Sequence, residues 1–175
     1  SILEISGADH SFKDSVTGLP KYFDKVLELL FMNQNLEKDR KGKKKTLAIE
    51  PVAQEFDYDC GWGGISDVML IIGRLDVLKT DLYRRLEVDP VEGTRIKNIK
   101  RLFDEEKIEY LEMTGASISD LESILDLGHI CLVCYQAWGT EEEMSTLDSG
   151  HYSVVFDMDD ENVWLIDPSV REEEV

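Results

Sequence analysis

Four side chains of this sequence could together perform acyl transfer through a thiol: Gln54, Cys60, His151 and Asp167. Cys60 precedes residues 65–72, whose apolar side chains cover almost every side of a helix, so a helix buried in a core is predicted there. The first turn of a helix carries unpaired N–H groups and partial positive charge, which favour a thiolate over a thiol. We therefore expect Cys60 to act as a nucleophile at the start of a buried helix.

The side-chain amide of Gln54, six residues before Cys60, could donate a hydrogen bond to an oxyanion that forms near the sulfur. The backbone N–H of Cys60 would be the second donor. Each residue also has a simpler interpretation, because a cysteine alone is more often a core residue and a glutamine alone is most often a surface amide. Their occurrence together, beside Gly61, Gly63 and Gly64, favours the site.

A predicted β-hairpin brings a base and an acid to one end of two strands. Residues 150–158 and 163–167 have strand-like patterns and are joined by the turn-rich tetrapeptide Asp-Asp-Glu-Asn. An antiparallel pair centred on this turn places His151 nearly opposite Asp167, close enough for the carboxylate to orient the imidazole. Asp157 shares a face with His151 but lies several residues nearer the turn, so it should not contact the ring.

Other chemically capable residues have structural interpretations. His129 follows a helix-ending glycine and begins an apolar strand, which we favour over a role as the base. Cys131 and Cys134 lie three apart on that strand and face opposite sides, which suits neither a disulfide nor a shared metal ion. Asp157, Asp159 and Glu161 resemble the start of a calcium-binding loop, but Asn162 stands where Gly is needed and Pro168 where Glu closes the loop, so we interpret the segment as a turn.

The order of these motifs resembles the bacteriocin-processing-type cysteine peptidases, family 39 of that class, and their stand-alone relatives in the papain clan. The similarity extends from about residue 46 to residue 170. The motifs that carry it are, in order, Gln54, Asp59-Cys60-Gly61, Gly150-His151-Tyr152 and Asp167-Pro168. The resemblance implies a papain-like fold, with Cys60 as nucleophile, His151 as base, Asp167 as orienting residue and Gln54 in the oxyanion hole.

The sequence departs from the family pattern at several points. Trp62, Gly63 and Gly64 follow Cys-Gly, where the family usually has Pro and then small residues. Asp59 places a negative charge beside the thiol, although the family often carries Asp there too. The family usually continues past Asp-Pro into another helix, whereas this chain ends at Val175. The sequence does not encode the membrane transporter that is attached to the bacteriocin processors, so export of leader peptides is not implied.

The composition predicts a single globular unit without a membrane span. The chain has 175 residues, of which 42% are hydrophobic and 32% charged, and no apolar run is long enough to cross a bilayer. A net charge of −18 argues against nucleic acid and anionic membranes as partners and favours basic peptides. Three cysteines, an odd number, and no visible signal peptide predict a reducing, cytoplasmic location.

The predicted fold class is α+β, with N-terminal helices packed on a C-terminal antiparallel sheet. Residues 1–45 are predicted to be an extension with one helix, over 20–32, and a basic loop, followed by a papain-like domain over 46–175. Further helices are expected over 65–73, 80–86, 94–103 and 117–128, strands over 2–5, 108–113, 129–137, 150–158 and 163–167, and extended or loop segments over 46–52 and 138–149.

Together these patterns predict a hydrolase that cleaves a peptide or a related amide through a thioester on Cys60, without a metal or cofactor. An acyl or peptidyl transferase could use the same machinery. A non-catalytic relative could instead keep the cleft and bind basic peptides or a partner protein, with Trp62 reshaping that cleft. Neither the substrate nor the oligomeric state leaves a pattern in the sequence.

Overall fold

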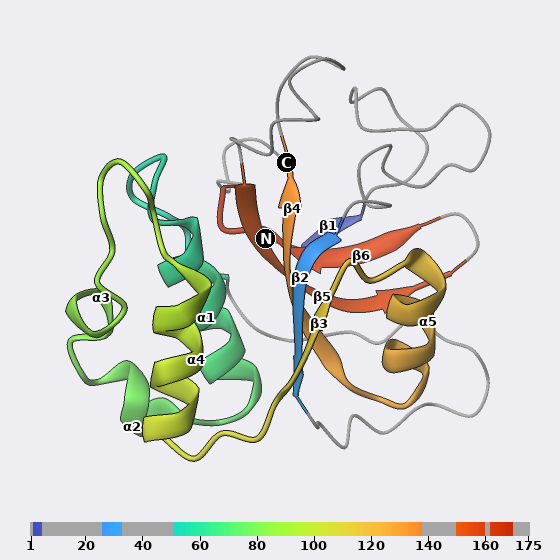
Figure 1. Ribbon diagram of the computed structural model, residues 1–175, viewed down its shortest axis with the longest axis horizontal. Coiled ribbons are helices and arrows are strands. Elements are labelled where there is room, and N and C mark those ends of the chain that lie inside the picture. Colours follow the sequence, from blue (N-terminus) through green and yellow to red (C-terminus); the bar gives the residue numbers. More distant parts are fainter. Residues whose placement is uncertain (1, 5–25, 33–50, 138–149, 160–161, 170–175) are drawn as a thin grey trace.

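An antiparallel six-stranded sheet separates four helices from a fifth in the computed structural model (Figure 1), which describes residues 2–4, 26–32, 51–137, 150–159 and 162–169. The strands, in their order across the sheet, are β1 (Ile2–Glu4), β6 (Val163–Ile166), β5 (Gly150–Met158), β4 (Ile130–Gln136), β2 (Val26–Met32) and β3 (Leu111–Thr114). Each strand runs antiparallel to its neighbours. The predicted α+β class is confirmed.

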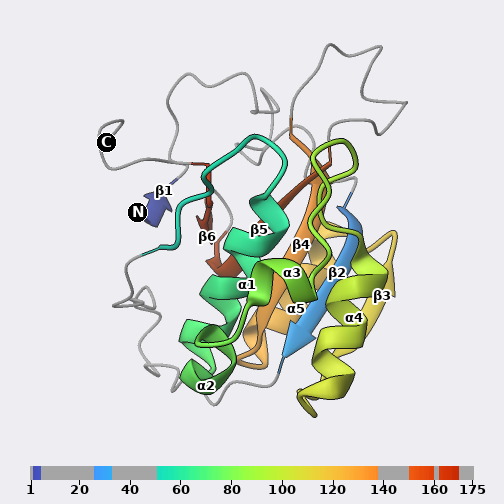
Figure 2. The ribbon, with the colours of Figure 1, turned by 90° about the vertical axis from the view of Figure 1, so that its left-hand side faces the viewer.

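Helices cover both faces of the sheet (Figures 1 and 2). One face carries α1 (Cys60–Ile71), α2 (Leu75–Leu78), α3 (Leu82–Arg85) and α4 (Ile96–Glu105), and the other carries α5 (Ile118–Asp126). Buried side chains of α1 and α4 pack with Leu132 and Val154, whereas those of α5 pack with Val133 and Val155. Because β4 and β5 are covered on both faces, their sequences are almost continuously apolar. No helix in the described segments is long and apolar enough to cross a membrane.

Local signals in the sequence place the ends of α5 correctly. The hydroxyl of Ser117 accepts a hydrogen bond from the backbone N–H of Asp120, whose carboxylate in turn accepts one from the N–H of Ser117, so the predicted capping box is present. Gly128 follows the helix with a φ of +88°, the left-handed conformation that favours glycine after a helix end. The helix predicted from residue 94 begins slightly later, at Ile96.

The helix predicted over 20–32 is wrong for the part that the structure describes, because Val26–Met32 forms strand β2. A short, nearly continuous apolar run fits a buried strand as well as a buried helix, and here pairing with β3 and β4 decides between them. Thus β1 and β2 both come from the predicted extension and join the sheet of the predicted domain. The basic loop after β2, residues 46–50 and the loop 138–149 lie outside the described residues.

The predicted hairpin of β5 and β6 is present with a shifted register. Val154 pairs with Ile166, so continuing the ladder by one residue places Asp167 beside Ser153 and not opposite His151. Next to the turn Met158 pairs with Val163, so the hairpin is centred beyond residue 159, the midpoint of His151 and Asp167, and a β-bulge between Val155 and Asp157 offsets only one residue of this shift. His151 and Asp167 are therefore diagonal neighbours on one face, which is still within reach of long side chains.

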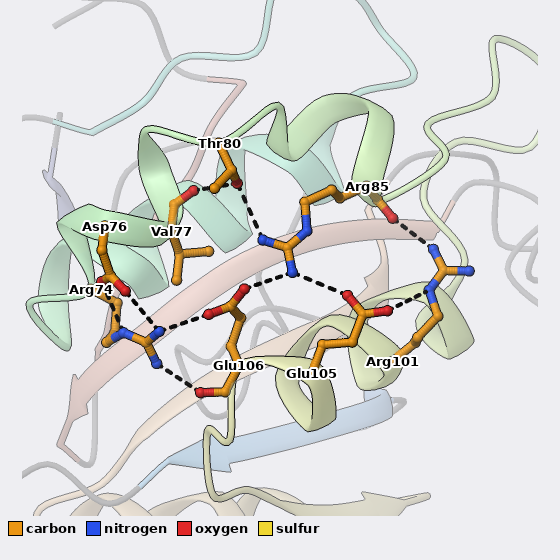
Figure 3. Close-up of polar contacts among 8 residues, drawn as sticks. All are labelled: Arg74, Asp76, Val77, Thr80, Arg85, Arg101, Glu105 and Glu106. Carbon is orange, nitrogen blue, oxygen red and sulfur yellow. Dashed lines mark hydrogen bonds and ion pairs between the residues drawn. The ribbon is translucent and has the colours of Figure 1, made fainter.

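Ion pairs join the short helices α2 and α3 to the end of α4 (Figure 3). Arg85 of α3 pairs with Glu106 at 2.6 Å and with Glu105 at 3.0 Å. Arg74, which precedes α2, pairs with the same Glu106 at 2.8 Å and donates to its backbone oxygen at 2.9 Å. The network holds α3 against α4 and thereby restrains the connecting loop 86–95, which approaches the start of α1.

Candidate active site

Cys60 is the first residue of α1, and its side chain is buried. Asp59 precedes it at the N-cap, where an aspartate usually accepts hydrogen bonds from the first turn of the helix. Here its carboxylate instead accepts from the backbone N–H groups of Glu55, at 3.3 Å, and Phe56, at 3.1 Å. Asp59 therefore shapes the loop before the helix and leaves the first turn of α1 without a side-chain cap.

Two segments approach the first turn of α1 closely and so position Cys60. A Cβ atom at Gly63 would lie only 2.6 Å from the Cβ of Pro168, so only glycine leaves room for the segment that follows β6. A Cβ atom at Gly64 would lie 3.7 Å from the Cβ of Tyr152, near the start of β5. The first turn of α1 thus lies beside the start of β5 and the end of β6.

The imidazole of His151 and the carboxylate of Asp167 are in direct contact, with Nε2 and Oδ1 2.7 Å apart. Both side chains are buried. The same carboxylate oxygen accepts from the backbone N–H of Ser169 at 2.8 Å and from its hydroxyl at 2.7 Å. The carboxyl of Asp157 accepts from the N–H of Met158. The predicted contact of His151 with Asp167 is therefore confirmed, and the hydrogen bonds that hold Asp167 restrict its orientation.

The electrostatic surroundings of His151 favour its protonated form. Burial alone would lower the pKa of the ring, but hydrogen bonds to Asp167 and Cys60 outweigh it and raise the pKa of His151 to about 9. The pKa of Asp167 is lowered, since burial is outweighed by the hydrogen bond to His151 and those from Ser169. Because Nε2 faces the carboxylate, Nδ1 is the ring nitrogen left for the sulfur. The structure thus places the imidazole of His151 in contact with the carboxylate of Asp167 and close enough to the thiol of Cys60 for the two to interact.

Tyr135 and Ser153 also belong to this group of buried polar side chains, and neither was predicted from the sequence. Tyr135 pairs with His151 across β4 and β5, and the two rings meet edge to face with centroids 5.9 Å apart. Its hydroxyl lies 3.3 Å from the hydroxyl of Ser153 and 3.5 Å from Oδ2 of Asp167. Burial, and then the charge of Asp167, raise the pKa of Tyr135 above its usual range, so the phenol is a neutral donor. Tyr135 could have been identified only from the register of β4 with β5, which no local motif encodes.

The contact between Cys60 and His151 joins the two faces of the sheet. Tyr135 packs in the cluster that α5 covers, and His151 is its partner in the ladder, whereas Cys60 belongs to the cluster around α1. Side chains on opposite faces can meet only where the strands end. The site therefore lies at the start of β5 and the end of β6, beside the first turn of α1.

Gln54, the predicted oxyanion donor, lies next to the segment that carries Asp167. Its backbone N–H donates to the carbonyl of Pro168 at 2.8 Å. Its side-chain Nε2 donates to the carbonyl of Phe56 at 3.0 Å, and its Oε1 is buried with no partner among the described residues. The amide has a second N–H, which is the group that an oxyanion would require.

Aromatic side chains from both sides of Cys60 in the sequence pack together, and they are Phe56, Tyr58, Trp62 and Tyr83. The ring of Trp62 packs against that of Tyr83 in α3, with centroids 6.0 Å apart, and Tyr83 is hydrogen-bonded to Tyr58. Phe56 stacks on Tyr58 at 5.2 Å and is 48% exposed. Trp62 therefore packs on α3 as part of a surface beside the thiol.

The alternative site residues lie elsewhere. His129 directly precedes β4, whereas Tyr135, which contacts His151, lies near the other end of that strand. Cys131 is buried in the cluster around α5, and Cys134 packs against the cluster around α1, so the two cysteines face opposite sides as predicted. In the segment interpreted as a turn, the N–H of Asp159 donates to the carbonyl of Asn162, and residues 160 and 161 between them lie outside the described residues. The position of His129 disfavours it as the base, and the positions of the two cysteines agree with their structural interpretation.

Among the described residues, no group of three or more His, Cys, Asp or Glu side chains could hold a metal ion. Comparisons with protein-family models, with curated proteins and with solved structures found no match to this chain. The function is therefore inferred from the contacts of Cys60, His151 and Asp167 themselves.

Proposed function

We propose that this protein is a cysteine-dependent hydrolase with a papain-like fold, which cleaves a peptide or a related amide through a thioester on Cys60. The observation that carries the proposal is the position of His151, whose ring contacts the carboxylate of Asp167 at 2.7 Å and whose pKa is raised by interactions with both Asp167 and Cys60. A nucleophile, a base and a group that orients the base are the components of covalent acyl transfer.

In the proposed reaction the proton of the thiol resides on His151, and the thiolate attacks the carbonyl carbon of the scissile amide. The C–N bond then breaks while the imidazolium gives its proton to the leaving amine, which leaves a thioester on Cys60. Water attacks the thioester as His151 accepts one of its protons, and the acid departs with the sulfur restored. Asp167 keeps its charge throughout and stabilises the imidazolium.

The uncapped first turn of α1 supports a site for the developing oxyanion. Because the carboxylate of Asp59 is bonded to the preceding loop, it does not cap the first turn of α1, where the backbone N–H of Cys60 would be the first oxyanion donor. The partial positive charge of the helix start acts in the same direction. Gln54 would supply the second donor through its remaining N–H.

Replacing Gln54 with alanine is expected to lower turnover by about a hundredfold or more, since removal of one oxyanion donor typically has that effect. Affinity for a peptide and alkylation of Cys60 should change little. Gln54→Glu is the matched control, because it keeps the size of the side chain but replaces both N–H donors with an acceptor, and it should be at least as slow. Unchanged turnover with weakened affinity in both variants would contradict this role.

We further propose that the substrate is a peptide with a basic side chain near the scissile bond. The support is the loop before Cys60, where Glu55 and Asp57, the sequence neighbours of Phe56, are exposed together with its half-exposed ring. Carboxylates and an aromatic ring in one exposed loop attract a guanidinium or ammonium group. The net charge of −18 has the same sign and disfavours nucleic acid and anionic membranes.

The double variant Glu55→Gln/Asp57→Asn is expected to lower kcat/KM for basic peptides by about threefold to tenfold, because each exposed charge pair contributes modestly. The kcat/KM for neutral peptides of the same length should not change. Glu122→Gln, on the exposed side of α5, serves as a matched control that removes a charge elsewhere. Equal losses for basic and neutral peptides would refute selection by charge.

Turnover of a broad peptide library by the parent protein and by Cys60→Ala tests the proposal itself. Cleavage that is lost in Cys60→Ala is the expected result. If the parent cleaves nothing while Cys60→Ala binds the same basic peptides with unchanged affinity, the protein is a peptide-binding module. Transfer of the acyl group to an added amine in preference to water would identify a transferase.

A further inference from the structure

Asp67 is a carboxyl group buried in the middle of the nucleophile helix, and the proposed reaction does not use it. It lies seven residues after Cys60 and has no solvent exposure. One oxygen, Oδ1, accepts a hydrogen bond from the backbone N–H of Val52 at 2.8 Å. The other, Oδ2, is buried without a partner in the described part of the chain.

This carboxyl is not explained by core packing. Burial raises the pKa of Asp67 to about 7, and the hydrogen bond from Val52 is the largest effect that opposes burial. A buried carboxyl with one unpartnered oxygen destabilises the fold relative to an apolar side chain of similar size. We therefore look for its role in the segment around Val52, whose backbone N–H it binds.

The segment held by Asp67 reaches the candidate active site within two residues. The carbonyl of Val52 lies 3.1 Å from the Cβ position of Gly63, so the segment runs along the same face of α1, one turn from Asp67. Two residues later, the N–H of Gln54 donates to the carbonyl of Pro168 at 2.8 Å. Residues 52–54 are thus fastened to α1 at one end and to the segment after β6 at the other.

We propose that Asp67 is a positioning residue, which fixes residues 52–54 on α1 through its hydrogen bond to Val52 and so places Gln54 beside Pro168 at the active site. Without this bond residues 52–54 keep the hydrogen bond of Gln54 to Pro168 but lose the one that ties Val52 to α1, so the Gln54 amide samples more positions. The catalytic consequence rests on the proposed hydrolase function, whereas the placement of the segment does not.

The test compares two variants of the full chain. Asp67→Leu is close in size to Asp67 but has no acceptor, whereas Asp67→Asn keeps a carbonyl oxygen for the Val52 N–H. Amide hydrogen exchange at Val52 and Gln54 is expected to be about tenfold faster in Asp67→Leu, because loss of one hydrogen bond lowers local protection by about that factor. In Asp67→Asn the exchange should stay near that of the parent.

Turnover supplies the second measurement. In Asp67→Leu, kcat is expected to fall about tenfold while KM and the alkylation rate of Cys60 stay nearly constant, since only oxyanion stabilisation is weakened. Asp67→Asn should restore most of the loss. Combining Asp67→Leu with Gln54→Ala should be no slower than Gln54→Ala alone, because the two changes act on the same group.

The outcomes separate the two proposals. Unchanged exchange at Gln54 in Asp67→Leu, or equal effects of the Leu and Asn variants, would overturn the positioning role whatever the activity. Faster exchange in a protein that never cleaves a peptide would retain the positioning role and reject the hydrolase. If Asp67→Leu does not fold, Asp67→Ser, whose hydroxyl is too short to reach Val52 in the same way, carries the same expectations.

Discussion

Replacing His151 with alanine is expected to lower peptide turnover by about a hundredfold to ten-thousandfold, the range associated with loss of a general acid and base. Alkylation of Cys60 near pH 6 should slow in the same variant, because an ordinary thiol has little thiolate at that pH. The physical cause is the imidazolium that Asp167 stabilises 2.7 Å away. Both rates can be measured on one preparation with a fluorogenic peptide and iodoacetamide.

The raised pKa of His151 predicts the direction in which the reactivity of Cys60 changes with pH. The pKa of His151 in the folded protein is about 9, above the ordinary value of 6.5, so its stabilising contribution is complete below 6.5 and is lost as the pH rises through 9. The advantage of Cys60 in alkylation over the partly exposed Cys134, which serves as an internal comparator, should disappear over the same interval. His129→Ala is the matched control. An equal effect of that control, or unchanged alkylation in His151→Ala, would contradict the arrangement.

Replacing Gly63 with alanine is expected to destabilise the protein by about 1–3 kcal/mol, although alanine normally favours a helix over glycine. The added Cβ would lie 2.6 Å from the Cβ of Pro168 and 3.1 Å from the carbonyl oxygen of Val52, and both neighbours belong to backbone or ring atoms that cannot rotate away. Thermal unfolding would show the loss. Turnover should fall as well, because Pro168 follows Asp167 directly.

Gly64→Ala is the matched control for this change, since it adds the same atom in the same turn of α1. There the nearest neighbour is the end of the flexible Leu132 side chain at 3.2 Å, which can move by a few tenths of an ångström. We expect little loss, or a small gain, in the free energy of unfolding. Equal destabilisation by the two variants would show that helix geometry, and not contact with Pro168, determines the cost.

Much of the site could be predicted because its signals are local in the sequence. An apolar run after a glycine-rich loop predicted α1 and the position of Cys60 at its start, and a turn between two alternating segments predicted the hairpin with His151 and Asp167. The capping residues Ser117 and Asp120 predicted the start of α5. The helix start and the cap depend on residues a few positions apart, and the hairpin depends on two strand-like segments joined by a short turn, so the sequence displays each pattern directly.

The features that the sequence analysis missed depend on contacts between distant segments. Val26–Met32 was assigned to a helix because a short apolar run does not show whether it will pair with β3 and β4. Tyr135 contacts His151 only through the register of two strands. The requirement for glycine at position 63 becomes clear only from its close contact with Pro168. In each case the partner is more than ten residues away.

The place of β2 in the sheet affects how the chain reaches its folded state during synthesis. β2 lies between β3 and β4, so its partners are made long after it, as in the pair of Met32 with Ile130, and β1 waits for residues as distant as Ile166. Contacts this far apart are slow to form, because a long loop must close first. While the ribosome is still adding β4 to β6, β2 has an unpaired edge that can recruit other chains. A fragment that begins after β2 would leave the same kind of edge on β4 permanently.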